Sequence, residues 1–195
     1  MSHNIYQTEC FVLGSHNTGE SNKLFLLITK DLGFVMAVAQ GIRDLKSKLR
    51  YSLQNFGYTK VDLVLGRDIW RITNAESING YQQLFKDENY AIFIAHIFST
   101  LRRLLHGEGE NQELYESLTQ LMCFLDKDIL SKDELDNLEI VMNLKILNSL
   151  GYGTDNEIYR ELILMPPSRD VLNKVKPIKR NCLIDINKSL QETHL

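Results

Sequence analysis

The chain has 195 residues, 44% of them hydrophobic and 24% charged, which is ordinary for a soluble globular protein of one compact domain or two small ones. Its longest nearly unbroken apolar run, residues 90–98, is too short to span a bilayer, and residues 1–4 lack the features of a secretory signal. Three cysteines far apart in sequence argue against a disulfide framework and favour the cytoplasm.

The net charge of −3 conceals an asymmetry along the chain. Residues 1–80 carry nine Lys/Arg and seven Asp/Glu, residues 81–165 carry seven and fifteen, and residues 166–195 carry six and three. The three parts therefore have net charges of +2, −8 and +3. Because nucleic-acid binding depends on local potential and not on the sum, this distribution is compatible with a first part that binds nucleic acid.

The first 80 residues are predicted to form five short strands. Apolar and polar residues alternate in residues 58–65, whereas residues 34–40 are apolar on both faces, which predicts a strand covered on both sides. Five strands in roughly 75 residues favour a small barrel, and the OB-fold is one such barrel. The predicted strands are residues 6–15, 24–29, 34–40, 58–65 and 70–73.

After residue 80 the apolar period changes to 3.6, which predicts helices. Two apolar stripes, separated by residues 107–110, predict one helix each. The first stripe is Tyr90, Ile94, Ile97, Leu101, Leu104 and Leu105, and the second is Leu114, Leu118, Leu121 and Leu125. The predicted fold class is α+β, with an all-β N-terminal OB-fold barrel in residues 1–80 followed by an all-α helical domain in residues 81–195.

A third helix has a clear start signal. Ser131 and Glu134 have the spacing of a capping box, and the helix should run to about Leu150, with Gly151 in the left-handed conformation that follows a helix end. Its apolar residues cover more than one stripe, which predicts a central position in the bundle. Farther on, residues 165–168 break regular structure, and a last short helix is predicted over residues 184–195.

Residue patterns that carry catalysis or bind metals are missing from the sequence. No glycine-rich loop precedes a helix, and the Cys and His residues lack the spacing of zinc ligands. His96 is expected to be a packed or hydrogen-bonded core residue, and the acidic residues between 108 and 139 are expected in connections and first helical turns. Nothing favours a catalytic triad. The sequence therefore predicts a protein that is not an enzyme and has no metal or cofactor.

One stretch, residues 40–56, is a candidate for function and is called the basic segment below. It contains four cations within eight residues against one acid, and it joins two predicted strands. In a five-stranded barrel such a connection would lie beside a groove that follows a nucleic-acid backbone, with Tyr51, Phe56 and Tyr58 available to stack on bases. The alternative is a solvated basic loop whose aromatic residues belong to the core.

A series of motifs in the first domain carries a resemblance. The motifs are Phe11-Val12-Leu13, Gly19-Glu20-Ser21-Asn22-Lys23-Leu24, Gly33, Ala37-Val38-Ala39-Gln40-Gly41-Ile42-Arg43, Lys46-Ser47-Lys48-Leu49-Arg50, Leu53-Gln54 and Phe56. In this order they closely resemble the N-terminal domain of the RecO family, the recombination mediators of bacterial DNA repair. Residues 144–153 are similar to the central helix of that family and its exit.

The resemblance implies a protein that binds single- and double-stranded DNA, anneals complementary strands and works with RecR. It also implies that the helical domain engages the tail of single-strand-binding protein, and that the protein acts in the bacterial cytoplasm, at the nucleoid. The basic segment of the family maps onto Arg43, Lys46, Lys48 and Arg50. Lys23 and Tyr51 complete the predicted nucleic-acid contacts.

Two departures from the family pattern and two competing hypotheses qualify this interpretation. Gln40 stands where the family usually has Lys, and residues 154–165 lack the cysteines of a zinc module that many members carry, so a shortened, zinc-free helical domain is expected. The alternatives are a protein-interaction adaptor whose barrel does not bind DNA usefully and an RNA-binding OB protein.

Because the tail of single-strand-binding protein is acidic, we expect its contact at cations of the second domain. These are Arg102 and Arg103, or Lys174, Lys176, Lys179 and Arg180.

Overall fold

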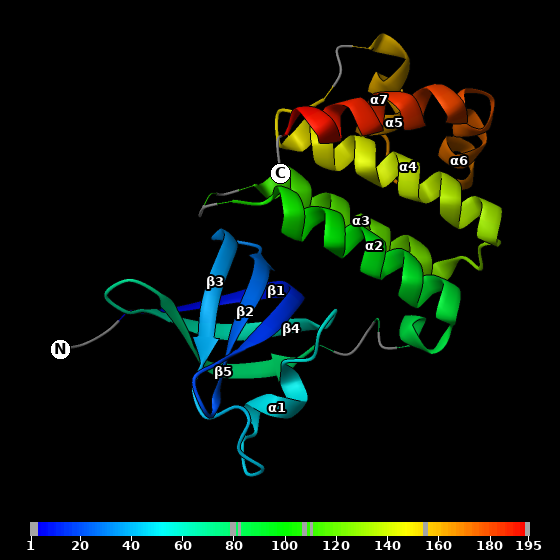
Figure 1. Ribbon diagram of the computed structural model, residues 1–195. Coiled ribbons are helices and arrows are strands. Elements are labelled where there is room, and N and C mark those ends of the chain that lie inside the picture. The colour runs from blue at the N-terminus through cyan, green and yellow to red at the C-terminus, as the bar shows by residue number, and fades with distance from the viewer. Residues whose placement is uncertain are drawn as a thin grey trace. The chain divides into compact units, whose positions relative to one another are not determined.

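A computed structural model describes residues 4–78, 81, 83–106, 109, 111–153 and 156–193. The chain divides into two compact units (Figure 1). The first comprises Met1–Gln82 with Leu105–Gln112, and the second comprises Gln83–Leu104 with Glu113–Leu195. Within the described part, no helix is both long enough and apolar enough to cross a membrane.

The first unit is a closed five-stranded barrel with the strand order β1-β2-β3-β5-β4. Its pairs are antiparallel except β3 and β5, which run parallel and meet at Ala37–Trp70 and Val38–Arg71. β1 pairs with both β2 and β4 and so closes the barrel. The strands are β1 (Ile5–Thr18), β2 (Asn22–Thr29), β3 (Gly33–Ala39), β4 (Tyr58–Leu65) and β5 (Trp70–Ser77). The predicted five-stranded OB barrel is confirmed, because its strands lie where the alternation of apolar residues placed them.

The barrel interior is filled by alternate residues of its strands. In β3, Val35 and Ala37 belong to the buried core cluster, as expected for residues that share one face of a strand. The other face was predicted to be covered as well, and Phe34 is indeed only 7% exposed. That prediction is wrong at Met36, which is 44% exposed. The apolar pattern of a strand does not indicate how far along the strand other residues cover its outer face.

The second unit is a helical bundle centred on α4 (Lys132–Ser149). The helix begins at Ser131 with the capping box complete, and Gly151 has a φ of +80° beyond its end, so both predicted boundaries are confirmed. It is buried along several faces and neighbours four other helices, which explains why its apolar residues form no single stripe. Those four are α2 (Glu88–Leu104), α5 (Glu157–Leu164), α6 (Arg169–Val175) and α7 (Lys179–Glu192).

The remaining elements are short, apart from α3 (Gln112–Lys127), which buries its predicted leucine stripe. A turn of 3-10 helix, η1 (Leu84–Lys86), precedes α2, and another, η2 (Lys176–Ile178), joins α6 to α7. Residues 107, 108 and 110, part of the predicted separator between α2 and α3, lie outside the described residues. Together the helices confirm the predicted all-α second part.

Three predictions for the helical unit are wrong. The last helix begins at Lys179, five residues before the predicted start, and α5 and α6 were not predicted. Leu105 lies beyond the end of α2 and is only half-buried. His96 is not in the core, because it lies on the solvent side of α2, where its Nδ1 is 3.3 Å from a carboxylate oxygen of Glu139 on α4.

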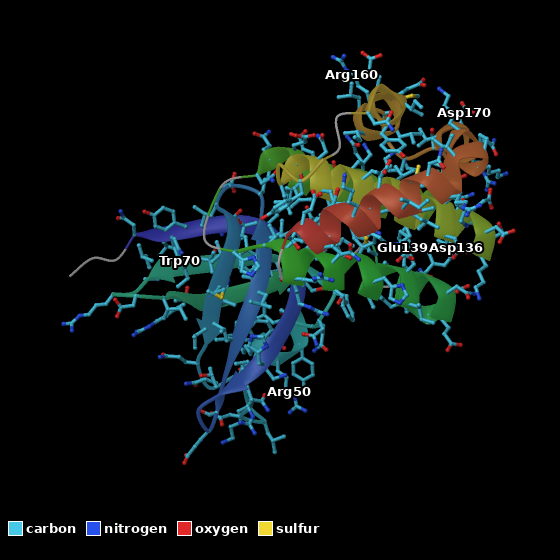
Figure 2. The ribbon with its side chains drawn as sticks, turned by 45° about the horizontal axis from the view of Figure 1, so that its top comes forward. Arg50, Trp70, Asp136, Glu139, Arg160 and Asp170 are labelled. Atoms are coloured by element: carbon cyan, nitrogen blue, oxygen red, sulfur yellow. The ribbon has the colours of Figure 1, made fainter. Side chains whose placement is uncertain are left out.

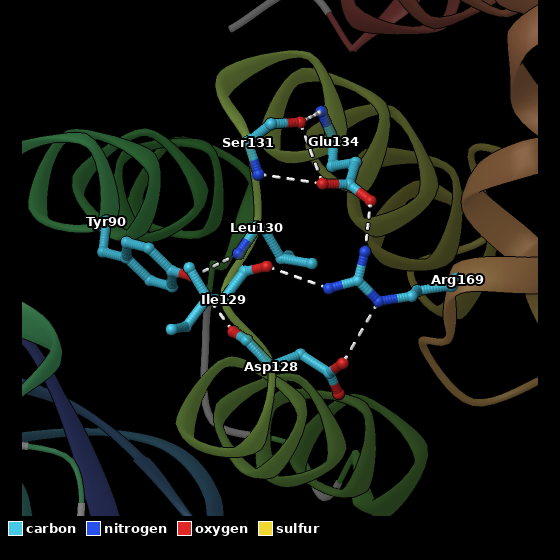
Figure 3. Close-up of polar contacts among 7 residues, drawn as sticks. All are labelled: Tyr90, Asp128, Ile129, Leu130, Ser131, Glu134 and Arg169. Atoms are coloured by element: carbon cyan, nitrogen blue, oxygen red, sulfur yellow. Dashed lines mark hydrogen bonds and ion pairs between the residues drawn. The ribbon is translucent and has the colours of Figure 1, made fainter.

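The connection from α3 to α4 is held by a polar network (Figure 3). Arg169, the first residue of α6, donates to Glu134 Oε1 at 2.7 Å, to the Ile129 carbonyl at 2.9 Å and to Asp128 Oδ1 at 3.3 Å. On the other side of the connection, the Tyr90 hydroxyl accepts from the Leu130 amide at 2.8 Å. The charged groups of this network therefore serve the fold of the bundle.

Candidate nucleic-acid interface

The basic segment is fastened to the β1–β2 turn. The Gly41 amide donates to Asn22 Oδ1 at 2.9 Å, and Gly41 has a φ of +62°, a conformation that favours glycine. Arg43 donates from its amide to the Ser21 carbonyl at 3.0 Å and from Nη1 to the Gly19 carbonyl at 3.3 Å. These bonds explain structurally why residues 19–24 and 37–43 occur together in one motif series.

Apolar residues anchor the same segment in the barrel. Ile42 is 3% exposed and Leu53 is 5% exposed, and both belong to the barrel core. Between them the chain forms two turns and a single helical turn, α1 (Leu49–Ser52). Because the apolar side chains occupy the inner side, the cations of the segment are directed outward, and Arg43, Lys46, Lys48 and Arg50 are all exposed.

Three of the predicted contact residues surround one hollow. Lys23, Arg43 and Arg50 line a cavity of about 530 Å³ on the barrel, and Figure 2 shows Arg50 on the outside of the strands. On its rim, the Ser15 hydroxyl donates to Asn55 Oδ1 at 3.0 Å. We call this cavity the basic hollow. Its lining combines cations with amide and hydroxyl groups, which suits an anionic, hydrogen-bonding ligand.

The other predicted residues of the segment lie apart from this hollow. Lys46 and Lys48 are exposed but do not line it, and neither does Tyr51, which is 77% exposed. Tyr58 was expected to be open for base stacking, and this is wrong. Its ring stacks on Phe11 with centroids 4.7 Å apart, and its hydroxyl donates to Glu9.

Phe56, the last of the three aromatic candidates, is half-buried and has a φ of +66°. The left-handed conformation is less favourable by about 1–2 kcal/mol for a residue that has a Cβ. Here the conformation is held by a hydrogen bond from the Phe56 amide to the Val12 carbonyl at 2.8 Å. The strained residue lets the basic segment turn sharply into β4. Of the three aromatic residues, Tyr51 is therefore the one most open to solvent.

The cations of the barrel have no carboxylate partners among the described residues, where every ion pair involves two residues of the helical unit. The Arg43 side chain donates to a neutral carbonyl, so within the described structure no carboxylate compensates its charge. Four like charges within eight residues repel one another, and an anionic ligand relieves that repulsion. Within the described residues, the basic hollow is lined by three cations that have no carboxylate partner, Lys23, Arg43 and Arg50.

The second predicted group of cations, in the helical unit, is partly neutralised. Lys174 pairs with Glu161, and Lys179 Nζ lies 3.8 Å from Asp136 Oδ2. Arg103, near the end of α2, donates to the Leu190 carbonyl at 3.3 Å. Lys176 and Arg180 are exposed and have no ion pair within the described part of the chain. The structure thus uses part of the predicted patch to hold α5 and α7 in place.

The last features of the described residues to consider are the buried thiols and the side chains that could bind a metal ion. Burial raises the pKa of the Cys10 thiol in the barrel core, which keeps that group protonated. Burial also raises the pKa of the Cys182 thiol in α7. No three His, Cys, Asp or Glu side chains of the described residues are grouped to hold a metal ion.

Comparisons with known proteins agree on one family. Residues 1–81 match the family model described as Recombination protein O N terminal. The DNA repair protein RecO of Clostridium novyi (strain NT) is 28% identical over 153 residues, covering 78% of this chain and 59% of that protein. RecO of Thermoanaerobacter sp. (strain X514) is 27% identical, covering 76% of this chain and 58% of that protein. The chain spans about three fifths of the length of the curated relatives it matches.

Proposed function

Because the chain belongs to the RecO family, we propose that it is a non-catalytic DNA repair and recombination protein whose barrel binds DNA along the basic segment. One observation carries the proposal: Lys23, Arg43 and Arg50 converge on one hollow without carboxylate partners in the described residues. Phosphates of a DNA backbone supply the missing negative charge, and the release of their counterions favours binding. The OB barrel is an architecture that commonly presents such a groove to oligonucleotides.

The basic segment is also suited to annealing, because it attracts phosphates without reading sequence. Contacts from Lys and Arg to phosphates carry no sequence information, so two complementary strands are held equally well. The proposed ligands are therefore single- and double-stranded DNA, and the proposed activity is the annealing of complementary strands. Recombinase loading together with RecR and with the tail of single-strand-binding protein completes the proposed role.

The test removes Arg43, Lys46, Lys48 and Arg50 together by substitution with Ala. Four phosphate contacts to a single strand predict a salt slope of roughly −2.8, from about −0.7 per contact. The variant should lose this slope. A slope of about −2.8 changes the affinity roughly 600-fold when the salt concentration changes tenfold, from 1 M to 0.1 M, so the variant should bind roughly 600-fold more weakly at 0.1 M salt. Fluorescence anisotropy with an oligothymidylate measures both quantities, and a strand-annealing assay should show the activity lost.

A matched control removes the same charge elsewhere. Lys30, Lys86, Lys127 and Lys132 are exposed and make no ion pair in the described structure, so their substitution by Ala should leave the slope within about one contact of the original. Unchanged affinity and slope in the basic-segment variant would overturn the proposal. If this protein gives no gel shift with DNA at low salt, the result would instead support the protein-interaction adaptor. Tighter binding of RNA than of DNA of equal length would identify an RNA-binding protein.

The proposed contact with single-strand-binding protein depends on the cations of the helical unit. Lys176 and Arg180 are the exposed members of the predicted group that have no ion pair among the described residues, so they are the first to test. Charge reversal of both should weaken the binding of the acidic tail peptide, measured by calorimetry. Unchanged affinity after reversal of these two together with Arg102 and Arg103 would remove this contact from the proposal.

A further inference from the structure

A second, larger groove lies on the barrel at the connection between β4 and β5. Its volume is about 1260 Å³, and we call it the β4–β5 groove. Much of its lining is apolar and open to solvent. The most exposed apolar residues of the lining are Ile5, Leu65 and Ile69, at 66%, 48% and 37%. Its charged residues are Arg67, Asp68 and Arg71.

Exposed apolar side chains gather at this end of the barrel. Ile5, the first residue of β1, pairs with Val64, one residue before the end of β4. The neighbouring Tyr6 is 40% exposed, and its ring meets that of Trp70 edge to face with centroids 5.3 Å apart. Figure 2 labels Trp70, which directly follows the connection. Isolated apolar residues are common on protein surfaces, whereas several on adjoining strands mark an interaction surface.

The connection itself is closed tightly. Leu65 pairs with Trp70 across it, and the Gly66 amide donates to the Ile69 carbonyl at 3.0 Å. A Cβ on residue 66 would lie 2.8 Å from the Ile69 oxygen, so glycine is required there. Because a hydrogen bond already orders this turn, a partner that binds it does not have to immobilise it, and the entropic cost of binding is lower.

The turn carries two opposite charges next to each other in the sequence. Arg67 and Asp68 are both exposed, and neither forms an ion pair within the described structure. A purely anionic ligand would be attracted by Arg67 and repelled by Asp68, and a cationic ligand would experience the reverse. A surface with both charges is complementary to a copy of itself, since a two-fold axis can place each Arg67 opposite the Asp68 of the other copy.

We propose that the β4–β5 groove is the interface for a second copy of this chain. In the proposed two-fold dimer the exposed apolar side chains of both copies pack against one another, and Arg67 of each copy pairs with Asp68 of the other. Apolar contacts at the centre with charges at the rim are the usual composition of a protein–protein interface. Symmetric pairs are also the commonest assembly of identical chains. This association goes beyond the proposed function and does not require DNA.

The basic hollow does not belong to this interface. The lining of the groove and the lining of the hollow share no residue. A dimer formed through the groove therefore carries two basic hollows, one on each copy. Association and DNA binding are accordingly separable by substitution, because each depends on its own residues.

The first test reverses single charges. Sedimentation equilibrium of the full chain without DNA, at increasing protein concentration, should show a monomer–dimer equilibrium. Arg67→Asp and Asp68→Arg should each weaken the dimer by roughly tenfold or more, because each turns two attractive pairs into two repulsive ones. An equimolar mixture of the two variants should dimerise again, since one copy then carries two acids and the other two cations. The double variant Arg67→Asp with Asp68→Arg should also dimerise, because the exchange keeps the surface self-complementary.

The second test removes apolar surface. Leu65→Ser with Ile69→Ser should abolish the dimer, because it takes away two exposed aliphatic side chains of the groove. Ile129→Ser is the matched control and should leave the dimer intact, since Ile129 is 90% exposed on the connection before α4 and does not line the groove. Urea denaturation followed by tryptophan emission checks that the barrel of each variant is folded.

The third charge of the groove provides a further check. With Arg71 included, each copy brings two positive charges and one negative charge to the interface, so the copies repel one another through their net charge. Arg71→Gln should therefore tighten the dimer, and a weaker dimer would contradict the proposed pairing.

The results that would overturn the dimer are distinct from those that bear on DNA. A wild-type chain that stays monomeric at every concentration refutes it, and so does a mixture of the Arg67→Asp and Asp68→Arg variants that stays monomeric. Binding of polyglutamate or polylysine to the groove of a monomeric chain would assign this surface to a different protein and would also overturn the dimer. The variant with four Ala substitutions in the basic segment should dimerise like the wild type, so a failure of the proposed function leaves the dimer standing.

Discussion

In the helical unit, Arg169, Lys174 and Lys179 each pair with a carboxylate of another element, whereas Arg43 and Arg50 of the barrel have no such partner within the described structure. The difference is not one of composition, because both units contain acids and bases. In the bundle, charged side chains form ion pairs that hold short helices to α4 and to the connection that precedes α4. In the barrel, the fold is held by apolar anchors, and the charges remain available to a ligand. Stability and binding are therefore assigned to different residues.

The largest expected effect concerns the anchor beneath the basic segment. Leu53→Ala should destabilise the barrel by about 2–5 kcal/mol, because it empties a site that is only 5% exposed in the core. Urea denaturation measures the loss, and weaker DNA binding should follow as the segment loosens. Leu45→Ala is the matched control on the same segment, since Leu45 is 82% exposed and its truncation should change stability by less than about 0.5 kcal/mol. Equal effects of the two changes would contradict the division between anchor and charge.

A smaller effect is expected in the bundle. Arg169→Ala breaks bonds to two carboxylates and one carbonyl, and we expect a loss of about 1 kcal/mol, a low value because the side chain is half-exposed. Thermal denaturation provides the measurement. Arg160, labelled in Figure 2, is an exposed arginine without a described ion pair, so Arg160→Ala should be close to neutral. A bundle that tolerates both changes equally would show that its ion pairs do not stabilise it.

The smallest effect is a pH dependence. Hydrogen bonds from the Ser131 amide and hydroxyl, and to a lesser extent the charge of Arg169, lower the pKa of Glu134. A carboxyl with a lowered pKa in the folded state contributes stability above its unfolded pKa and loses it as the pH falls through the folded pKa. Wild-type protein should therefore lose stability on acidification below about pH 4.3, the ordinary value for Glu. Glu134→Gln can still cap the helix but should show a flatter pH profile in denaturation experiments, and an identical profile would refute the assignment.

The sequence was sufficient for those elements whose signals are local. The capping box at Ser131 and the alternation in β4 each depend on residues within one element, and both are confirmed. α6 is not among the predicted helices, although Ser168 caps it and accepts from the Val171 amide, because the two prolines before Ser168 indicate only where regular structure breaks. α5 likewise begins at a capping residue, Asn156. Both helices therefore begin at a local capping signal that is present in the sequence.

Features that depend on long-range pairing could not be obtained in this way. Lys23 and Arg50 meet at one hollow only because β2 pairs with both neighbours and the basic segment folds back onto the β1–β2 turn. Tyr58 looks available in sequence, but its partners Phe11 and Glu9 are supplied by the neighbouring strand β1. The resemblance to a family supplied part of this information, since it groups residues that only the folded barrel brings together.

The single tryptophan of the chain lies in the barrel core, at the start of β5, and is 6% exposed. Its emission therefore reports on the first unit alone, while far-ultraviolet circular dichroism is dominated by the helices of the second. One denaturation series followed by both signals will show whether the two units lose structure in a single cooperative transition or independently of each other. The chain thus carries its own spectroscopic means of measuring how strongly its two halves are coupled.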